Sequence, residues 1–122
     1  MPIGQKSVAI IDDDDEVRDG LVSLLDAVGF LTETYSSGEQ FIEAASNSKA
    51  GCLVVDIHLG DITGVELGRH LVAQGLTFPI IFMTGSDDPA VRQQAMEFGC
   101  VAYFLKPFPP NQLIKAIIEA VG

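Results

Sequence analysis

Positive charge is scarce in this chain. Its 122 residues include 7 Lys and Arg against 17 Asp and Glu, for a formal net charge of −10. A surface of this sign is repelled by nucleic acid and by anionic membranes. We therefore expect no direct nucleic acid binding by this chain and no membrane association. Its partners should be cations or other proteins.

Cysteines and long apolar stretches are also few. Cys52 and Cys100 are isolated, and hydrophobic residues make up 48% of the chain, enough for a core. Two small buried thiols are therefore expected rather than a disulfide. No apolar stretch approaches membrane-spanning length, and the start at Met1–Gly4 lacks the charged and apolar regions of a signal peptide. We predict a cytoplasmic protein with one domain, residues 1–122.

Apolar runs alternate with amphipathic segments along the chain. The runs that predict strands are 7–11, 31–35, 52–55, 80–83 and 102–105. The segments that predict helices are 16–28, 38–46, 64–74, 89–98 and 110–121. This alternation with short loops predicts an α/β fold, with a parallel sheet covered by helices on both faces. Ligands of such folds bind beyond the carboxyl ends of the strands.

Several residues are typical of helix starts. Ser37 with Gln40 three positions later has the pattern of a capping box. Asp88 before Pro89 predicts a helix cap followed by a proline at the first helical position.

Four consecutive acids, Asp12 to Asp15, follow the apolar run 8–11. A run without a polar break is typical of a strand buried on both faces. Acids at its carboxyl end repel one another, and a bound cation would relieve this repulsion. Asp14 and Asp15 also fit a solvated helix start, where acids favour the helix dipole. Asp12 and Asp13 fit that explanation poorly, so the cluster alone favours a metal site only slightly.

Three further strand ends carry reactive groups, namely Asp56, Thr84 and Lys106, whereas the run 31–35 is followed by uncharged serines. Singly, these residues are explained by a helix cap, a turn and an exposed lysine. Together they supply carboxylates for a divalent cation, one carboxylate as a nucleophile, and a hydroxyl and an ammonium for an oxyanion. These groups are the equipment for phosphoryl transfer to a carboxylate.

The ordered set of motifs resembles the receiver domain of two-component response regulators over essentially the whole chain. The motifs are Val8–Asp13, Leu53–Asp56 with Gly64 eight residues later, Thr84-Gly85 and Lys106–Phe108. The sequence around residues 51–53 and 83–85 is most similar to the branch of receivers often joined to helix-turn-helix output domains. The resemblance implies a flavodoxin-like, doubly wound, five-stranded parallel sheet in the strand order 2-1-3-4-5 with five helices. It also implies a phosphoacceptor switch that catalyses only its own phosphorylation and dephosphorylation, not a turnover enzyme.

The resemblance assigns roles to the strand-end residues. Asp56 would receive a phosphoryl group from a partner histidine kinase or histidine phosphotransfer protein. Asp13, Asp56 and the backbone carbonyl of His58 would ligate Mg²⁺, with Asp12 acting mostly through water. Lys106 would pair first with Asp56 and then with a phosphoryl oxygen.

Further roles concern the response to phosphorylation. Thr84 would hydrogen-bond the phosphoryl group, and Tyr103 would turn inward as Thr84 moves; a static packing role is the alternative for Tyr103. His58 and Ser86 would tune dephosphorylation, or else be plain loop residues. The family also implies a cis peptide bond before Pro107 and a homodimer formed on phosphorylation.

The sequence departs from the family pattern at two loops. Gly60 stands where receivers usually carry proline, so we expect a looser loop after the third strand. The metal would use a backbone carbonyl there, so its binding should survive in a weaker form. The loop 85–89 is unusually acidic, which fits helix capping most simply, although a role in partner choice or cation binding is the alternative.

Two other function classes can be compared with the motifs. A phosphatase of the haloacid dehalogenase type is crudely mimicked by Asp12, Asp14, Thr84 and Lys106. That class also needs an Asp-x-Asp-x-Thr/Val pattern, which a start at Asp12 does not complete because position 16 is Glu. It needs a later acidic strand end as well, and after Lys106 the chain offers only Glu119, within a helix pattern. This class would also leave Asp56 idle. A flavin-binding module would need a Thr/Ser/Gly-rich phosphate loop after the first strand, where this chain carries acids.

Overall fold

The computed structural model describes residues 7–122, so the signal-peptide expectation for Met1–Gly4 lies outside the described residues. Strands and helices alternate, with one short 3-10 turn, η2. The elements are β1 (Ser7–Ile11), α1 (Asp15–Val28), β2 (Leu31–Tyr35), α2 (Gly38–Ala44), η2 (Ala45–Asn47), β3 (Ala50–Asp56), α3 (Gly64–Ala73), β4 (Ile80–Thr84), α4 (Pro89–Phe98), β5 (Ala102–Leu105) and α5 (Pro110–Val121). In this part of the chain no helix is both long and apolar enough to cross a membrane.

The sheet is parallel throughout, in the order β2-β1-β3-β4-β5, so the predicted flavodoxin-like fold is confirmed. Three strands have the expected bounds. β3 starts earlier than expected, at Ala50, and both β3 and β4 extend by one residue to include Asp56 and Thr84. The expected helix 38–46 ends at Ala44 and tightens into η2.

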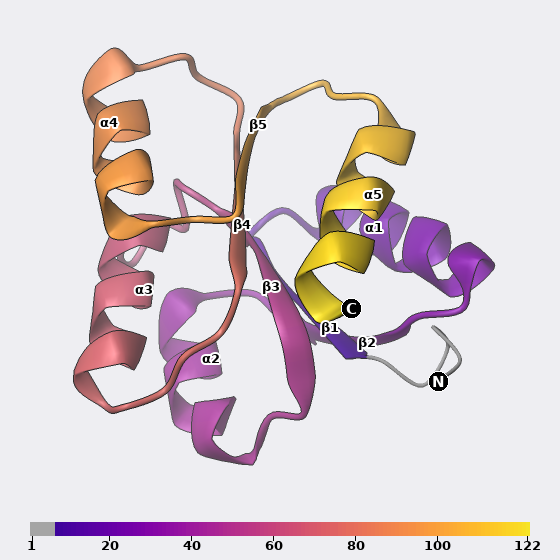
Figure 1. Ribbon diagram of the computed structural model, residues 1–122, viewed down its shortest axis with the longest axis horizontal. Helices are drawn as coiled ribbons and strands as arrows, with labels where there is room; N and C mark the ends of the chain where they lie inside the picture. The colour runs from indigo at the N-terminus through magenta and orange to yellow at the C-terminus, as the bar shows by residue number, and fades with distance from the viewer. Residues whose placement is uncertain (1–6) are drawn as a thin grey trace.

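Helices cover both faces of the sheet: α1 and α5 lie on one side, and α2, α3 and α4 on the other (Figure 1). Successive side chains of a strand point to opposite faces. In β1, Val8 and Ile10 join the core under α1 and α5, whereas Ala9 and Ile11 join the core under the other three helices. All four are fully buried, so the predicted strand buried on both faces is confirmed.

The helix starts follow their sequences with one exception. Ser37 caps α2 by accepting from the Gln40 N–H, as expected. The Gln40 side chain accepts from the Ser36 N–H at 2.8 Å instead of from Ser37, so the predicted capping box is only half formed. The reciprocal box is present on α3, between Thr63 and Glu66.

Other local expectations can be compared directly. Asp88 caps α4 with Pro89 at its start, as predicted. Cys52 and Cys100 carry free thiols; Cys52 is buried, but Cys100 is only half-buried. Burial raises the pKa of Cys52 to about 12, which keeps this thiol protonated.

Candidate functional site

The carboxyl ends of the central strands bring the polar residues together at one edge of the sheet. Ile11, which precedes Asp12, is in register with Val55, which precedes Asp56. Thr84 is in register with Leu105, which precedes Lys106. The register of neighbouring parallel strands therefore gathers one cation, two acids and a hydroxyl from four separate segments of the chain.

Lys106 connects two of these acids. Its Nζ donates to Asp56 Oδ2 at 2.7 Å and to Asp12 Oδ2 at 3.2 Å. Asp12 is fully buried and Asp56 is 7% exposed, whereas a quarter of the Lys106 side chain faces solvent. The Lys106 backbone N–H also donates to the Thr84 carbonyl at 2.7 Å, which aligns the lysine with the end of β4.

The charges of this group depend on burial and on one another. Burial raises the pKa of Asp12, and the charge of Asp56 adds to this, while the Asp14 N–H and Lys106 act in the opposite direction. Burial disfavours the charged form of Lys106, but its hydrogen bond to Asp56 and the charges of both acids outweigh burial and raise its pKa. Lys106 is therefore an ammonium at neutral pH and offsets part of the repulsion between the two carboxylates.

Asp56 is held by a separate partner on each oxygen. Oδ1 accepts from the His58 backbone N–H at 2.7 Å, and Oδ2 accepts from Lys106. The carboxylate is therefore fixed in orientation at the edge of the sheet while remaining slightly exposed. A fixed, accessible carboxylate next to an ammonium has the properties of a nucleophile for an anionic electrophile.

The run of four acids divides into different environments. Asp12 is buried and accepts from the Asp14 N–H at 2.9 Å, whereas Asp13 is exposed. Asp14 caps α1, as expected of a helix start. Arg18, which the sequence analysis did not single out, donates to the Asp12 carbonyl at 2.7 Å and pairs with Asp15. The sequence did carry a signal for this contact: Arg18 lies one turn into a helix that follows a run of acids.

Asp13 is the exposed acid that directly follows Asp12. It approaches the loop after β3: a Cβ on Gly60 would lie 3.4 Å from Asp13 Oδ2. Within residues 7–122, no three Asp, Glu, His or Cys side chains are grouped so that they could hold a metal by themselves. Mg²⁺ needs less, because it usually takes one or two carboxylates and keeps several waters. The two carboxylates expected as ligands, those of Asp13 and Asp56, are enough in number for such a site.

Thr84 is buried and its hydroxyl holds the loop after β4. The Ser86 N–H donates to Thr84 Oγ1, and the hydroxyl donates to the Ser86 carbonyl, both at 3.2 Å. Ser86 itself is exposed. Any ligand that forms a hydrogen bond with the Thr84 hydroxyl therefore competes with the Thr84–Ser86 hydrogen bonds that shape this loop.

Tyr103 lies on β5, in register with Phe82 of β4. Its ring is half-buried against the core under α2, α3 and α4, with the Arg92 guanidinium 5.7 Å from the ring centroid. Its hydroxyl is buried and has no hydrogen-bond partner among the described residues. Burial raises the pKa of Tyr103, and the nearby charge of Asp87 raises it further.

The remaining predicted residues are found at the rim of the site. The His58 side chain is exposed, and its backbone forms an isolated antiparallel bridge with Thr63 across the loop. The Lys106–Pro107 peptide bond is cis.

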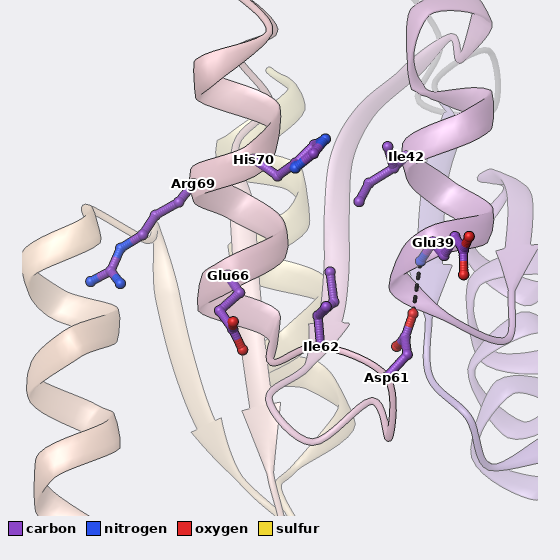
Figure 2. Close-up of a pocket in the computed structure, with 7 residues that line it drawn as sticks. All are labelled: Glu39, Ile42, Asp61, Ile62, Glu66, Arg69 and His70. Carbon is purple, nitrogen blue, oxygen red and sulfur yellow. Dashed lines mark hydrogen bonds between the residues drawn. The ribbon is translucent and has the colours of Figure 1, made fainter.

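A groove of about 690 Å³ lies between α2 and α3, away from these groups. Figure 2 shows Ile42 and Ile62 pointing into it, with Glu39 and Asp61 at one end. None of the strand-end residues lines this groove. The cluster at the edge of the sheet is therefore separate from this groove.

The family model of the response regulator receiver domain matches residues 8–118. The chain is 34% identical over 114 residues to the response regulator protein TodT of Pseudomonas putida, covering 93% of this chain and 50% of TodT. It is 35% identical over 114 residues to the transcriptional regulatory protein FixJ of Bradyrhizobium diazoefficiens, covering 93% and 56%. The crystal structure of FixJ-N matches with a TM-score of 0.89 at 35% identity, covering 96% and 94%. The chain spans about half the length of these curated relatives.

Proposed function

The chain belongs to the receiver domain family of two-component response regulators, and we propose that Asp56 is its phosphoacceptor. The observation that carries this proposal is the state of the Asp56 carboxylate. It ends the central strand, is oriented by the His58 N–H and Lys106, and is still reachable from solvent. The family match does not favour the haloacid dehalogenase alternative, which would leave this carboxylate without a role.

The proposed reaction is a phosphoryl transfer from a phosphohistidine on a histidine kinase or histidine phosphotransfer protein. An Asp56 oxygen forms a bond to phosphorus as the phosphorus–nitrogen bond breaks, and the electron pair of that bond leaves with the imidazole of the partner. Lys106, already bound to Asp56, is placed to follow the new negative charge and bind a phosphoryl oxygen. The domain would react once per signal, in the cytoplasm, and would later lose the phosphoryl group to water.

Asp13, Asp56 and the backbone carbonyl of His58 would hold Mg²⁺, whose charge would offset that of the transferred group. Asp12 has a different part in this proposal. It accepts from Lys106 and lies fully buried, so we assign it to positioning the ammonium, with any contact to the metal made through water.

The switch would begin at Thr84. A phosphoryl oxygen is a stronger acceptor than the Ser86 carbonyl, so the Thr84 hydroxyl would turn from the loop to the phosphoryl group. Loss of the Thr84–Ser86 bonds would free the loop after β4 to move. Tyr103, which packs half-buried on β5 next to β4, would change its packing as this loop moves.

His58 and Ser86 would set how long the phosphoryl group lasts. Both side chains are exposed at the rim, two residues after Asp56 and Thr84 respectively. A water that attacks phosphorus must enter past them, and His58 could donate to the phosphoryl oxygens or orient that water.

The proposed partners follow from the same reaction. We propose that residues 1–122 form the receiver domain and that its phosphorylated form can pair with a second copy. The acidic chain itself would not bind DNA, in keeping with its net charge of −10.

Phosphorylation of the purified domain tests the central proposal. Acetyl phosphate with Mg²⁺ should add one phosphoryl group to the parent chain, located at Asp56 by mass spectrometry. Asp56→Asn should abolish the addition, whereas Asp15→Asn, which changes an exposed acid, should not. Phosphorylation of Asp56→Asn at the parent rate would refute the assignment. Sustained turnover of p-nitrophenyl phosphate by the parent would favour a phosphatase instead.

A further inference from the structure

The loop between β3 and α3 is joined to the start of α2 by a side chain 22 residues away in sequence. Asp61 Oδ2 accepts from the Glu39 N–H at 3.0 Å, and Asp61 Oδ1 accepts from the Gly38 N–H at 3.3 Å. Figure 2 shows the Asp61 side chain reaching from the loop to the first turn of α2. We call this contact, made by Asp61 with Gly38 and Glu39, the α2 clamp.

The α2 clamp supplies two bonds that α2 cannot make for itself. The first N–H groups of a helix have no partner within the helix. Ser37 accepts only from the Gln40 N–H, so the N–H groups of Gly38 and Glu39 depend on Asp61. Burial raises the pKa of Asp61, but hydrogen bonds from backbone N–H groups, those of Glu39 and Gly38 among them, together outweigh burial and lower it.

Close packing accompanies the hydrogen bonds. A Cβ on Gly38 would lie 2.7 Å from two carbons of the Ile62 side chain and 3.5 Å from Leu59. Only a glycine lets the helix start approach the loop this closely. The loop is therefore fixed against α2 by both apolar and polar contacts.

Gly60 explains how the chain reaches this position. Its φ is +91°, a value that proline cannot adopt and that other L residues adopt only with strain. The glycine that replaces the usual proline therefore turns the chain just before Asp61. The loop makes contacts at Asp61 and Ile62 and in the His58–Thr63 bridge; the looser loop expected from the sequence stays a prediction.

We propose that Asp61 is a positioning residue for the phosphorylation site: the α2 clamp holds the backbone around His58 and so sets the affinity for Mg²⁺. This inference rests on the proposed function, because that function makes the His58 carbonyl a metal ligand and the His58 N–H a support of Asp56. Asp61 lies three residues after His58 within the same short loop, and that loop is fixed at its far end by the clamp. The start of α2 thereby contributes to the site.

Two Asp61 variants separate positioning from charge. Asp61→Ala removes both acceptors and one negative charge. Asp61→Asn removes the same charge but keeps one carbonyl acceptor. If the clamp positions the loop, Asp61→Ala should raise the Kd for Mg²⁺ about tenfold, as loss of outer ligand support commonly does, and Asp61→Asn should raise it less. Mg²⁺ titrations followed by amide NMR measure this directly.

Ser37→Ala is the matched control, because it removes the other cap of the same helix start without touching the loop. It should speed amide exchange of Gln40 and leave the Kd for Mg²⁺ within about twofold of the parent. Asp61→Ala should instead speed exchange at Gly38 and Glu39 about tenfold and slow phosphorylation by acetyl phosphate. The conservative Asp61→Asn should partly restore both.

The outcomes are distinct. If Asp61→Ala speeds amide exchange but matches Ser37→Ala in Mg²⁺ affinity and phosphorylation rate, the clamp is structural only and the inference is wrong. Equal weakening by Asp61→Ala and Asp61→Asn would mean that charge acts through space, which also overturns it. A parent chain that binds no Mg²⁺ and takes up no phosphoryl group would overturn the proposed function itself, whatever the exchange rates show.

Discussion

Replacing Lys106 with methionine tests the charge balance of the site most directly. The change keeps most of the side chain's length but leaves the buried Asp12 and the nearly buried Asp56 without their shared ammonium. Removing one partner of a fully buried ion pair costs about 3–5 kcal/mol, and exposed pairs contribute up to about 1 kcal/mol. Because a quarter of the Lys106 side chain is exposed, we expect a loss of about 2–3 kcal/mol in the free energy of unfolding at neutral pH.

The loss should depend on pH in a defined direction. Burial already raises the pKa of Asp12 above its ordinary value of 3.8, and Lys106 is one of the groups that oppose this rise. Its removal should raise the pKa of Asp12 further. An acid with a raised folded pKa contributes stability below its unfolded pKa and loses it as pH rises through the folded pKa. The deficit of Lys106→Met should therefore shrink on acidification, while the Lys106 contribution in the parent stays constant below its ordinary pKa of 10.5.

Urea unfolding followed by circular dichroism measures these differences. Parent and variant would be compared at about pH 7 and about pH 5, with and without Mg²⁺, whose charge should reduce the deficit. Lys115→Met, which removes the same charge from the exposed side of α5, is the control. An equal loss at both pH values, or a loss no larger than that of Lys115→Met, would refute the proposed charge balance.

Three further predictions concern single side chains. Asp13→Ala should weaken Mg²⁺ binding roughly tenfold, whereas Asp15→Ala should weaken it at most about twofold, because its exposed charge is screened; equal weakening in titrations would indicate a diffuse acidic patch. His58→Ala and Ser86→Ala should still be phosphorylated but should change the lifetime of the aspartyl phosphate after donor removal; parent-like lifetimes in both would leave them without a role in timing. Tyr103→Phe removes a hydroxyl that has no hydrogen-bond partner among residues 7–122, so the unfolding free energy should stay within about 0.5 kcal/mol of the parent; a loss above about 1 kcal/mol would show that the hydroxyl is bonded.

The arrangement of the strand ends could be predicted because it depends on local patterns. Apolar runs of strand length place Asp56 and Thr84 at strand ends, and parallel pairing then brings those ends to one edge. The unbroken run before Asp12 also predicted a strand buried on both faces. In each case the relevant information lies within a few residues of the chain.

Contacts between distant segments could not be predicted in the same way. Lys106 was expected to pair with Asp56, but its second bond, to Asp12, depends on the three-dimensional path of β5. Asp61 caps a helix that precedes it by 22 residues, and no local motif marks such a cap. The Thr63–Glu66 capping box did have a local signal, a threonine followed three residues later by glutamate. The sequence-based prediction instead placed a capping box at Ser37 and Gln40.

The two hydrogen bonds that Lys106 donates, to Asp12 and to Asp56, have a consequence for the order in which a newly synthesised chain can fold. Lys106 follows Asp12 by 94 positions and Asp56 by 50, so both acids leave the ribosome long before the ammonium that balances them. Burying an unpaired carboxylate is costly, which should delay close packing of the carboxyl ends of β1 and β3 during synthesis. A nascent chain that stops before β5 should therefore keep this edge of the sheet open to solvent, and the final strand would close it.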